Sequence, residues 1–221
     1  MNRNERRIYL NSQNLTELPA SVAQSTDLLH FSAYDNKLTT IPDWLWSLTD
    51  LQSLNLSVNQ LTTVSERIEE LTALCMLDLG HNQIKTLPEA IGHLPNLTDF
   101  LYLSDNGLQD LPESLTRLTE LRYLNVTDNQ LQALPDNIGN MRGLVELRAY
   151  RNPLKTLPDS IGELRDLREL YLDHTWLQHL PDTIGNLENL RVLSLRGCQL
   201  TTLPDVLGTL RDRLPVADLH H

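Results

Sequence analysis

The amino-acid sequence predicts an α/β fold. We expect a right-handed solenoid in the shape of a horseshoe, with a parallel β-sheet on the concave side and short helices or 3-10 turns on the convex side. One observation is a column of asparagine-type residues, spaced by 23 at every step except one of 24: Gln13, Asn36, Asn59, Asn82, Asn106, Asn129, Asn152, Thr175 and Cys198. A second is a proline column in the same rhythm: Pro19, Pro42, Pro88, Pro112, Pro135, Pro158, Pro181 and Pro204. A constant period keeps the apolar residues of stacked units in register.

The N-terminal part, residues 1–27, is predicted to be a polar arm and a half-repeat whose first strand lies at residues 8–10. Eight full repeats then span residues 28–210, and each opens with a variant of Leu-x-x-Leu-x-Leu-x-x-Asn. Alternation along the strand turns these leucines inward and exposes the residues between them. The repeat that starts at Leu97 is one residue longer, and we expect a bulge near Asp99 or Phe100 to absorb the addition.

The asparagine column is expected to hold the loops that follow the strands. A carboxamide both donates and accepts hydrogen bonds, so stacked asparagines can satisfy loop N–H and C=O groups that would otherwise be buried without partners. Gln13, Thr175 and Cys198 change this chemistry near the two ends. We therefore expect the central asparagines to contribute most to stability.

The convex segments are predicted to be short helices or 3-10 turns, because proline is well suited to the first position of a helical turn. The pattern Pro-x-x-Ile-Gly-x-Leu then places its apolar residues on one inward face. Ser65 replaces proline in one repeat, where it can act as an N-cap. In PDWLWSL, Trp44 and Trp46 flank the inward Leu45. These tryptophans either form an exposed patch, which would mark a second contact site, or lie flat over neighbouring turns.

The C-terminal stretch, residues 211–221, loses the repeat pattern. It is interpreted either as a polar cap, which repeat arrays need at their ends, or as the truncated start of a further region. His220 and His221 resemble the remnant of a purification tag. No linker or change of composition interrupts residues 1–221, so we expect a single domain.

The repeats resemble leucine-rich repeats. The turns LPDSIGELRDL and LPDTIGNLENL are similar to the 23-residue class found in Ras-group-related leucine-rich-repeat proteins of plants and animals, and to the repeat modules of bacterial effectors injected into host cells. The resemblance implies protein–protein recognition, for example of a GTPase or a host signalling protein. It also allows a targeting module that recruits substrates for a larger enzyme, although no ligase or kinase domain is found in this sequence.

Composition and motifs exclude several classes of function. The net charge of −11 is spread along the chain and argues against nucleic acid as a partner. No apolar run approaches the roughly 20 residues of a membrane span. The N-terminus has no hydrophobic signal core, so we expect a cytoplasmic location, or delivery into a host cell by a route that needs no cleaved signal. We expect a monomer.

Catalytic and metal sites are not expected either. The sequence contains no phosphate-binding glycine loop, no His-Glu-x-x-His, no Cys-x-x-Cys and no Gly-x-Ser-x-Gly. His81 and His174 lie four repeats apart, too far to share a metal. Cys75 and Cys198 are separated by about 24 Å of stacked strands, which excludes a disulfide between them. We therefore expect no enzyme and no cofactor.

Function is predicted to depend on the exposed residues of the concave sheet. All six tyrosines fall there, and tyrosine is enriched where proteins bind proteins. Arginines and carboxylates of the later repeats would add a mixed-charge rim. The predicted binding set is Tyr34, Met76, Phe100, Tyr102, Tyr123, Arg148, Tyr150 and Tyr171. Two alternatives remain, namely that aromatic residues simply suit strands, or that the same strip takes a carbohydrate or peptide ligand.

Overall fold

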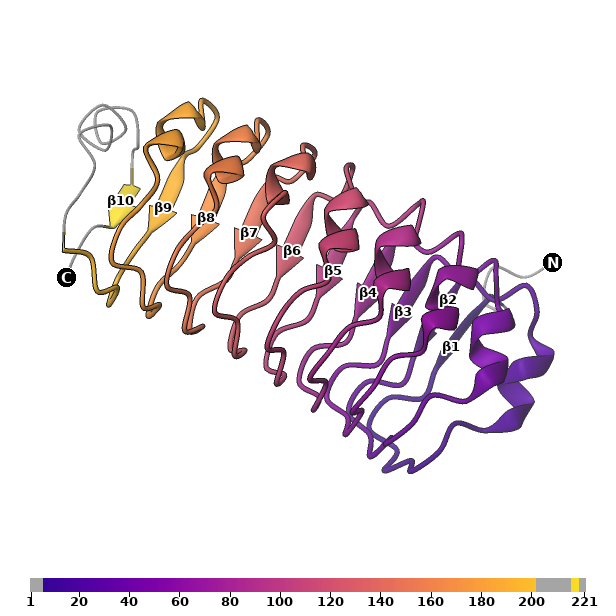
Figure 1. Ribbon diagram of the computed structural model, residues 1–221. Coiled ribbons are helices and arrows are strands. Elements are labelled where there is room, and N and C mark those ends of the chain that lie inside the picture. The colour runs from indigo at the N-terminus through magenta and orange to yellow at the C-terminus, as the bar shows by residue number, and fades with distance from the viewer. Residues whose placement is uncertain (1–5, 202–215, 219–221) are drawn as a thin grey trace.

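The chain folds into one open, parallel β-sheet along which the repeats are stacked (Figure 1). The structure is a computed structural model, and it describes residues 6–201 and the strand at residues 216–218. Within these residues ten strands follow one another in chain order from β1 to β10. Their bounds are β1 Arg7–Tyr9, β2 His30–Ser32, β3 Ser53–Asn55, β4 Met76–Asp78, β5 Phe100–Tyr102, β6 Tyr123–Asn125, β7 Glu146–Arg148, β8 Glu169–Tyr171, β9 Val192–Ser194 and β10 Val216–Asp218.

The strands pair in the register that the period predicts. Leu54 lies opposite Leu77, and Leu124 lies opposite Leu147, so each inward leucine stacks on the next. The longer repeat keeps this register, because Phe100 still pairs with Met76 on one side and with Tyr123 on the other. Its additional residue is accommodated by a bend at Asp99, ahead of the strand rather than within it.

The convex side carries short 3-10 helices, as the sequence predicts. They are η1 Ala20–Gln24, η2 Asp43–Ser47, η3 Glu66–Glu70, η4 Glu89–His93, η5 Glu113–Arg117, η6 Ile138–Asn140, η7 Asp159–Glu163 and η8 Asp182–Asn186. Proline with extended backbone precedes most of them, as Pro88 (φ −69°) does for η4. Ser65 replaces proline before η3, and its side chain accepts a hydrogen bond of 3.2 Å from the Arg67 amide. This confirms Ser65 as an N-cap.

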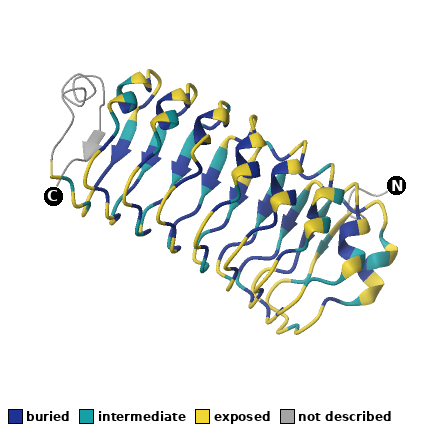
Figure 2. Ribbon diagram, viewed as in Figure 1, coloured by how far each residue is buried: buried dark blue, intermediate teal, exposed yellow. Residues whose placement is uncertain are grey.

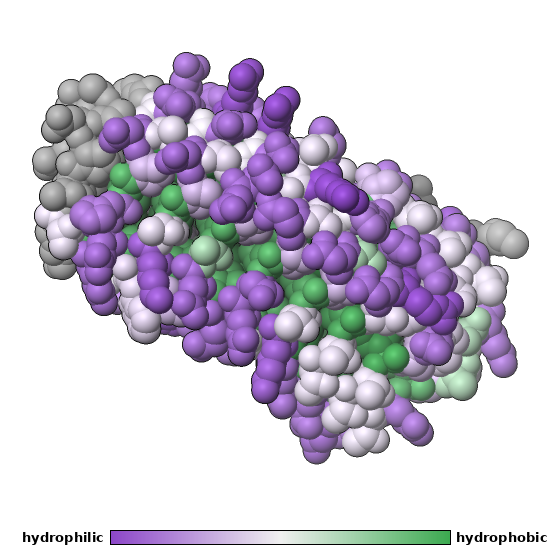
Figure 3. Space-filling view, viewed as in Figure 1, coloured by the Kyte–Doolittle hydropathy of each residue, from purple (hydrophilic) through white to green (hydrophobic). Residues whose placement is uncertain are grey.

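The core lies between the sheet and the 3-10 helices and runs through the whole array (Figure 2). The strand leucines, such as Leu121 and Leu124, are fully buried. Neighbouring 3-10 helices approach closely, because a Cβ added at Gly92 would lie 2.0 Å from the carbonyl oxygen of Ser114. Figure 3 shows a band of hydrophobic residues along the array, between hydrophilic side chains on both sides. The apolar residues of all described repeats thus form one continuous core.

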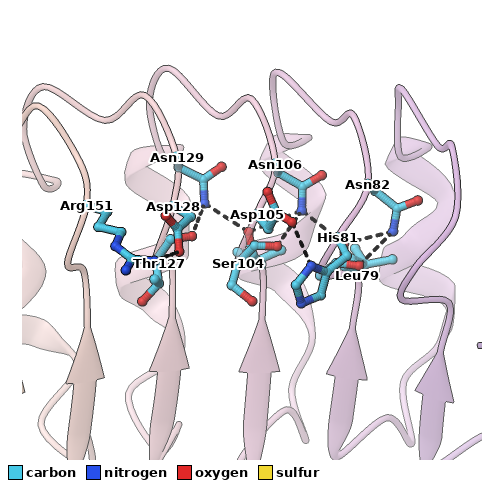
Figure 4. Close-up of polar contacts among 12 residues, drawn as sticks. Leu79, His81, Asn82, Ser104, Asp105, Asn106, Thr127, Asp128, Asn129 and Arg151 are labelled. Atoms are coloured by element: carbon cyan, nitrogen blue, oxygen red, sulfur yellow. Dashed lines mark hydrogen bonds and ion pairs between the residues drawn. The ribbon is translucent and has the colours of Figure 1, made fainter.

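The asparagine column forms a hydrogen-bonded ladder where the chain leaves the strands (Figure 4). Asn129 shows the pattern, because its Nδ2 donates to the carbonyl oxygens of Leu103, Val126 and Thr127 at 3.0–3.1 Å. Its Oδ1 accepts from the Leu108 amide at 3.0 Å. Each such asparagine therefore satisfies buried backbone groups of its own repeat and of the preceding one. The same carbonyl contacts are made by Asn36, Asn59, Asn82, Asn106 and Asn152.

The residue before each ladder position has left-handed backbone, which the sequence analysis did not predict. Its φ lies between 51° and 55° in the repeats from Asp35 to His174. Two neighbouring side chains of this column can pair, as His81 Nδ1 and Asp105 Oδ2 do at 2.7 Å (Figure 4). Val58 also occupies this column with φ 55°. A β-branched residue is strained in this region.

The C-terminal end requires a correction. Residues 211–221 were expected to lack the repeat pattern, yet Val216–Asp218 forms β10 and pairs in parallel with β9. Val216 lies opposite Val192, which is a spacing of 24 residues. The rest of the expected cap or truncated end, including His220 and His221, lies outside the described residues.

Candidate protein-binding face

The concave face carries a compact group of aromatic rings on adjacent strands. Phe100, Tyr102 and Tyr123, called the aromatic cluster below, project from β5 and β6. Their ring centroids lie 5.7, 5.6 and 5.0 Å apart. These distances are typical of attractive contacts between aromatic rings. Phe100 still exposes 39% of its surface, so part of the cluster faces solvent.

Arg148 on β7 continues the aromatic cluster toward the C-terminal repeats. Its guanidinium carbon lies 5.7 Å from the ring centroid of Tyr123 and 5.0 Å from that of Tyr171 on β8. Both contacts have the geometry of a cation–π interaction. The Arg148 Nε also donates to Glu146. Arg148 therefore joins the aromatic cluster to Tyr171 and is held in place by a carboxylate of its own strand.

Three phenols of this face, those of Tyr102, Tyr123 and Tyr171, have raised pKa values. Burial raises the pKa of Tyr123 to about 12. The pKa of Tyr171 is likewise raised to about 12, first by burial and then by the hydrogen bond of 2.7 Å that its hydroxyl donates to Glu169. Burial also raises the pKa of Tyr102. These three hydroxyl groups thus remain neutral, and those of Tyr102 and Tyr123 can donate hydrogen bonds to a partner.

The other predicted residues are distributed more widely. Met76 is half-buried and lies beside Phe100 in the sheet. Tyr150 follows β7, and the guanidinium carbon of Arg151 lies 5.9 Å from its ring centroid. Tyr34 follows β2, three strands away from β5, and is exposed on the same face. The structure therefore places Tyr34 apart from the aromatic cluster, whereas Met76 adjoins it.

The expected convex patch of two exposed tryptophans is wrong. Trp46 in η2 is only 1% exposed and belongs to the core, and Trp44 is partly buried against that core. Trp46 occupies the repeat position where glycine stands in η4, η6 and η7. Glycine lets neighbouring turns approach closely, whereas the tryptophan ring is enclosed at that place. An exposed tryptophan does exist, but it is Trp176, with 52% of its surface exposed.

A groove of about 600 Å³ lies beside the aromatic cluster, over the later strands. Its lining includes Arg148, Tyr150, Arg151, Tyr171, Asp173, His174 and Arg196. Sequence analysis proposed three of these as binding residues, Arg148, Tyr150 and Tyr171. The charged rim that it predicted from arginines and carboxylates of the later repeats includes Arg151, Asp173 and Arg196. It did not associate His174 with the site, although His174 occupies the loop column next to the asparagine-type residues.

Other kinds of site find no support in the described part of the chain. There, no group of three or more His, Cys, Asp or Glu side chains is placed to hold a metal ion. None of the helices described there is long and apolar enough to cross a lipid bilayer. Cys75 and Cys198 are both free.

Comparisons with protein families agree with the architecture. A model of the leucine-rich repeat region matches residues 57–156. Two further leucine-rich-repeat models match residues 3–61 and 189–210. No curated protein gives a significant match over the sequence.

Solved structures of leucine-rich-repeat proteins are similar to the chain over most of its length. A protein of Leptospira interrogans has a TM-score of 0.73 and 29% identity over 98% of this chain. The effector YopM of Yersinia pestis has a TM-score of 0.78 and 27% identity over 99% of it. A chain of the Drosophila Toll–Spätzle complex has a TM-score of 0.80 and 29% identity over 94%. The present chain spans 66%, 55% and 28% of the lengths of these three. The chain is a leucine-rich-repeat protein.

Proposed function

We propose that this chain is a non-catalytic scaffold that binds a protein partner through its concave face. The observation that carries the proposal is the aromatic cluster, joined to Tyr171 by Arg148. Tyrosine, phenylalanine and arginine are enriched at protein interfaces, and a few such side chains usually provide most of the binding energy. The cluster offers apolar area and neutral hydroxyl donors in one place. An apolar side chain of the partner would bind there, with polar contacts around it.

Similar proteins support binding of proteins in general. One of the similar chains was solved in the Toll–Spätzle complex, and another is the Yersinia effector. A partner such as a GTPase or a host signalling protein, and an intracellular place of action, belong to the proposal. The chain would act as a monomer, because a second copy of a protein with a net charge of −11 would be repelled.

The test is a pull-down from native or host lysate with quantitative mass spectrometry. The variant combines Tyr102→Ala, Tyr123→Ala and Tyr150→Ala. A matched control is Tyr9→Ala, which removes an exposed tyrosine at the N-terminal end of the sheet that lies outside the predicted binding set. Circular dichroism should be the same for all three proteins.

We expect the parent and the control to retain a common partner and the triple variant to lose it, by about tenfold or more. Retention of that partner by the triple variant would contradict the proposal, because the cluster would then not be the contact.

A second candidate function is the targeting module of a larger enzyme or effector. It is favoured by one observation, that the chain spans only part of the length of the similar proteins. The open reading frame beyond Asp218 tests it directly. A ligase or kinase domain encoded there would support this reading, and a native stop codon would remove it.

A further inference from the structure

We infer that the groove over β7 to β9 takes an acidic, extended segment of the partner protein, whose carboxylates contact the groove while an apolar side chain rests on the aromatic cluster. The inference rests on the proposed function, because it uses the same concave face. It adds the chemistry and the spacing of the segment that is recognised.

The charge of the groove differs from that of the rest of the chain. Three arginines, Arg148, Arg151 and Arg196, line it, against the single carboxylate of Asp173. The lining residues alone carry two net positive charges, with His174 counted as neutral. Three carboxylates beside the groove, those of Glu146, Asp128 and Glu169, contact Arg148, Arg151 and Tyr171. The groove therefore offers arginine donors to an acidic segment on a protein whose net charge is −11. Such complementarity favours one partner and one orientation.

The arginines are placed to donate hydrogen bonds to a carboxylate. Glu146 contacts Arg148 through Nε, and no described residue takes a hydrogen bond from the two terminal nitrogens of that guanidinium. Arg151 lies 3.5 Å from Asp128, and their side chains are 61% and 38% exposed. Exposed pairs of this kind contribute little energy. A carboxylate of the partner can therefore replace Asp128 at low cost, or add to the bond that Glu146 makes.

Two tyrosines of the groove also favour binding of an acidic segment. Tyr150 and Tyr171 line the groove beside the arginines. The Tyr171 hydroxyl already donates to a carboxylate, that of Glu169. A groove with arginine nitrogens and tyrosine rings suits the planar carboxylates of aspartate and glutamate and the methylene groups that carry them.

The sheet register sets the spacing between the two contacts. The aromatic cluster lies on β5 and β6, and the groove is centred near β8. Adjacent strands are about 4.8 Å apart, so the centres are separated by roughly 10–14 Å, which an extended chain covers in about three to four residues. A groove of about 600 Å³ holds a few side chains rather than a folded domain. The recognised segment therefore has an apolar residue and one or two acidic residues about three to five positions away.

The experiment selects a random 12-residue peptide library, displayed on phage, against the immobilised full chain. The best peptide is then synthesised with a fluorophore, and its Kd is measured by fluorescence polarisation. The groove variant combines Arg148→Gln, Arg151→Asn and Arg196→Gln. Asparagine is chosen at position 151 because the backbone there has φ 53°, which asparagine tolerates. The matched control combines Arg117→Gln, Arg142→Gln and Arg165→Gln, exposed residues of the convex turns.

We expect enriched peptides to carry Asp or Glu about three to five positions from Phe, Leu or Trp. The groove variant should bind the best peptide about tenfold more weakly than the control does, although both have lost three positive charges. Raising the salt concentration from about 50 to 300 mM should weaken binding to the control more than binding to the groove variant.

The inference is overturned if the enriched peptides are basic or uncharged, if no peptide is enriched, or if the groove variant binds as tightly as the control. A fourth protein separates this failure from failure of the proposed function. It carries Phe100→Ala and Tyr123→Ala with the groove intact. If it loses the peptide while the groove variant keeps it, the concave face is still the binding site and only the acidic segment is wrong. If both variants keep the peptide, both proposals fail for that ligand.

Discussion

The loops after β6 and β8 occupy the same place in the repeat, yet they are held differently. After β6, Asn129 makes four hydrogen bonds to buried backbone groups. After β8, Thr175 donates one bond of 2.9 Å to the carbonyl of Leu172 and lies 3.2 Å from the sulfur of Cys198. No described residue accepts from the Leu154 amide, which an asparagine at position 175 would satisfy.

A second difference lies in the neighbouring residue. Gln130, which follows Asn129, donates its amide to the Leu108 carbonyl at 2.8 Å. In the loop after β7, by contrast, Pro153 follows Asn152 and has no N–H to offer in the corresponding position. Repeats with similar leucine cores are therefore joined by different numbers of loop hydrogen bonds, and the loops of the last repeats should open before those of the middle.

The largest expected effect is that of Asn129→Ala. The substitution leaves the Leu108 amide without its acceptor in a loop where Asn129 is only 2% exposed. It also removes one of the two donors from each of three carbonyls, those of Leu103, Val126 and Thr127. We expect the free energy of unfolding to fall by about 3 kcal/mol, measured by urea denaturation. As a control, Asn137→Ala on the convex side removes an exposed bond to Glu113 and should cost less than about 0.5 kcal/mol. Equal effects of the two substitutions would show that the ladder has no special role.

The reverse substitution, in the loop after β8 that has fewer hydrogen bonds, should raise stability. Thr175→Asn supplies the acceptor that the Leu154 amide lacks, and donors for nearby carbonyls. We expect a gain of about 1–2 kcal/mol in the free energy of unfolding. Thr175→Val, which keeps the shape and removes the hydroxyl, should lower stability instead. A loss with asparagine would mean that the loop after β8 cannot adopt the geometry found after β6.

A smaller gain in stability is expected from a substitution in the column of residues with left-handed backbone, each of which precedes a ladder position. Val58 has φ 55°, a conformation that asparagine adopts far more readily than valine. Val58→Asn should raise the free energy of unfolding by about 1 kcal/mol, measured by thermal or urea denaturation. Val58→Ala keeps a side chain with the same backbone penalty and should bring little gain. If alanine stabilises as much as asparagine, backbone strain is not the cause.

The smallest expected effect is a dependence of stability on pH. It involves one phenol in each of the two compared repeats, Tyr123 on β6 and Tyr171 on β8. The pKa values of Tyr123 and Tyr171 are raised to about 12 in the folded chain, above the ordinary value of 10.0. The folded state therefore holds these protons longer than the unfolded state, and stability present below pH 10 is lost as the pH rises toward about 12. Ultraviolet titration at the phenolate band should show late-titrating phenols, of which Tyr123→Phe and Tyr171→Phe each remove one.

Repeated in moderate urea, this titration can distinguish the regions. If the C-terminal repeats open first, Tyr171 should return to an ordinary pKa at a lower urea concentration than Tyr123 does. Simultaneous return of both phenols would argue that the array opens as one unit.

Much of the fold could be predicted because the same sequence pattern gives the same local structure in every repeat. The register between Leu54 and Leu77 follows from the period, and the Ser65 cap follows from its place in the proline column. The left-handed column could not be predicted, because Val58, His81 and Arg151 share a backbone angle and no side-chain chemistry. Likewise, Trp46 interrupts a glycine position, and only the packing of η2 shows that its ring is enclosed.

The binding face was predictable in part. Strand alternation places Phe100, Tyr102 and Tyr123 on one side of the sheet, and their contacts follow from adjacent positions. Alternation does not reveal which charged groups neutralise one another. The pairing of Arg148 with Glu146 and of Arg151 with Asp128 depends on rotamers and became visible only in the structure.

The constant register has an evolutionary consequence. Because each strand pairs with the next at the same residues, loss or duplication of one 23-residue unit by recombination would join two surfaces that already fit. The gene can therefore lengthen or shorten the array without redesigning its core. The same event at the unit of β5 or at the unit of β6 would remove or duplicate part of the aromatic cluster. Related chains of different length can thus inherit one scaffold and diverge abruptly in what they recognise.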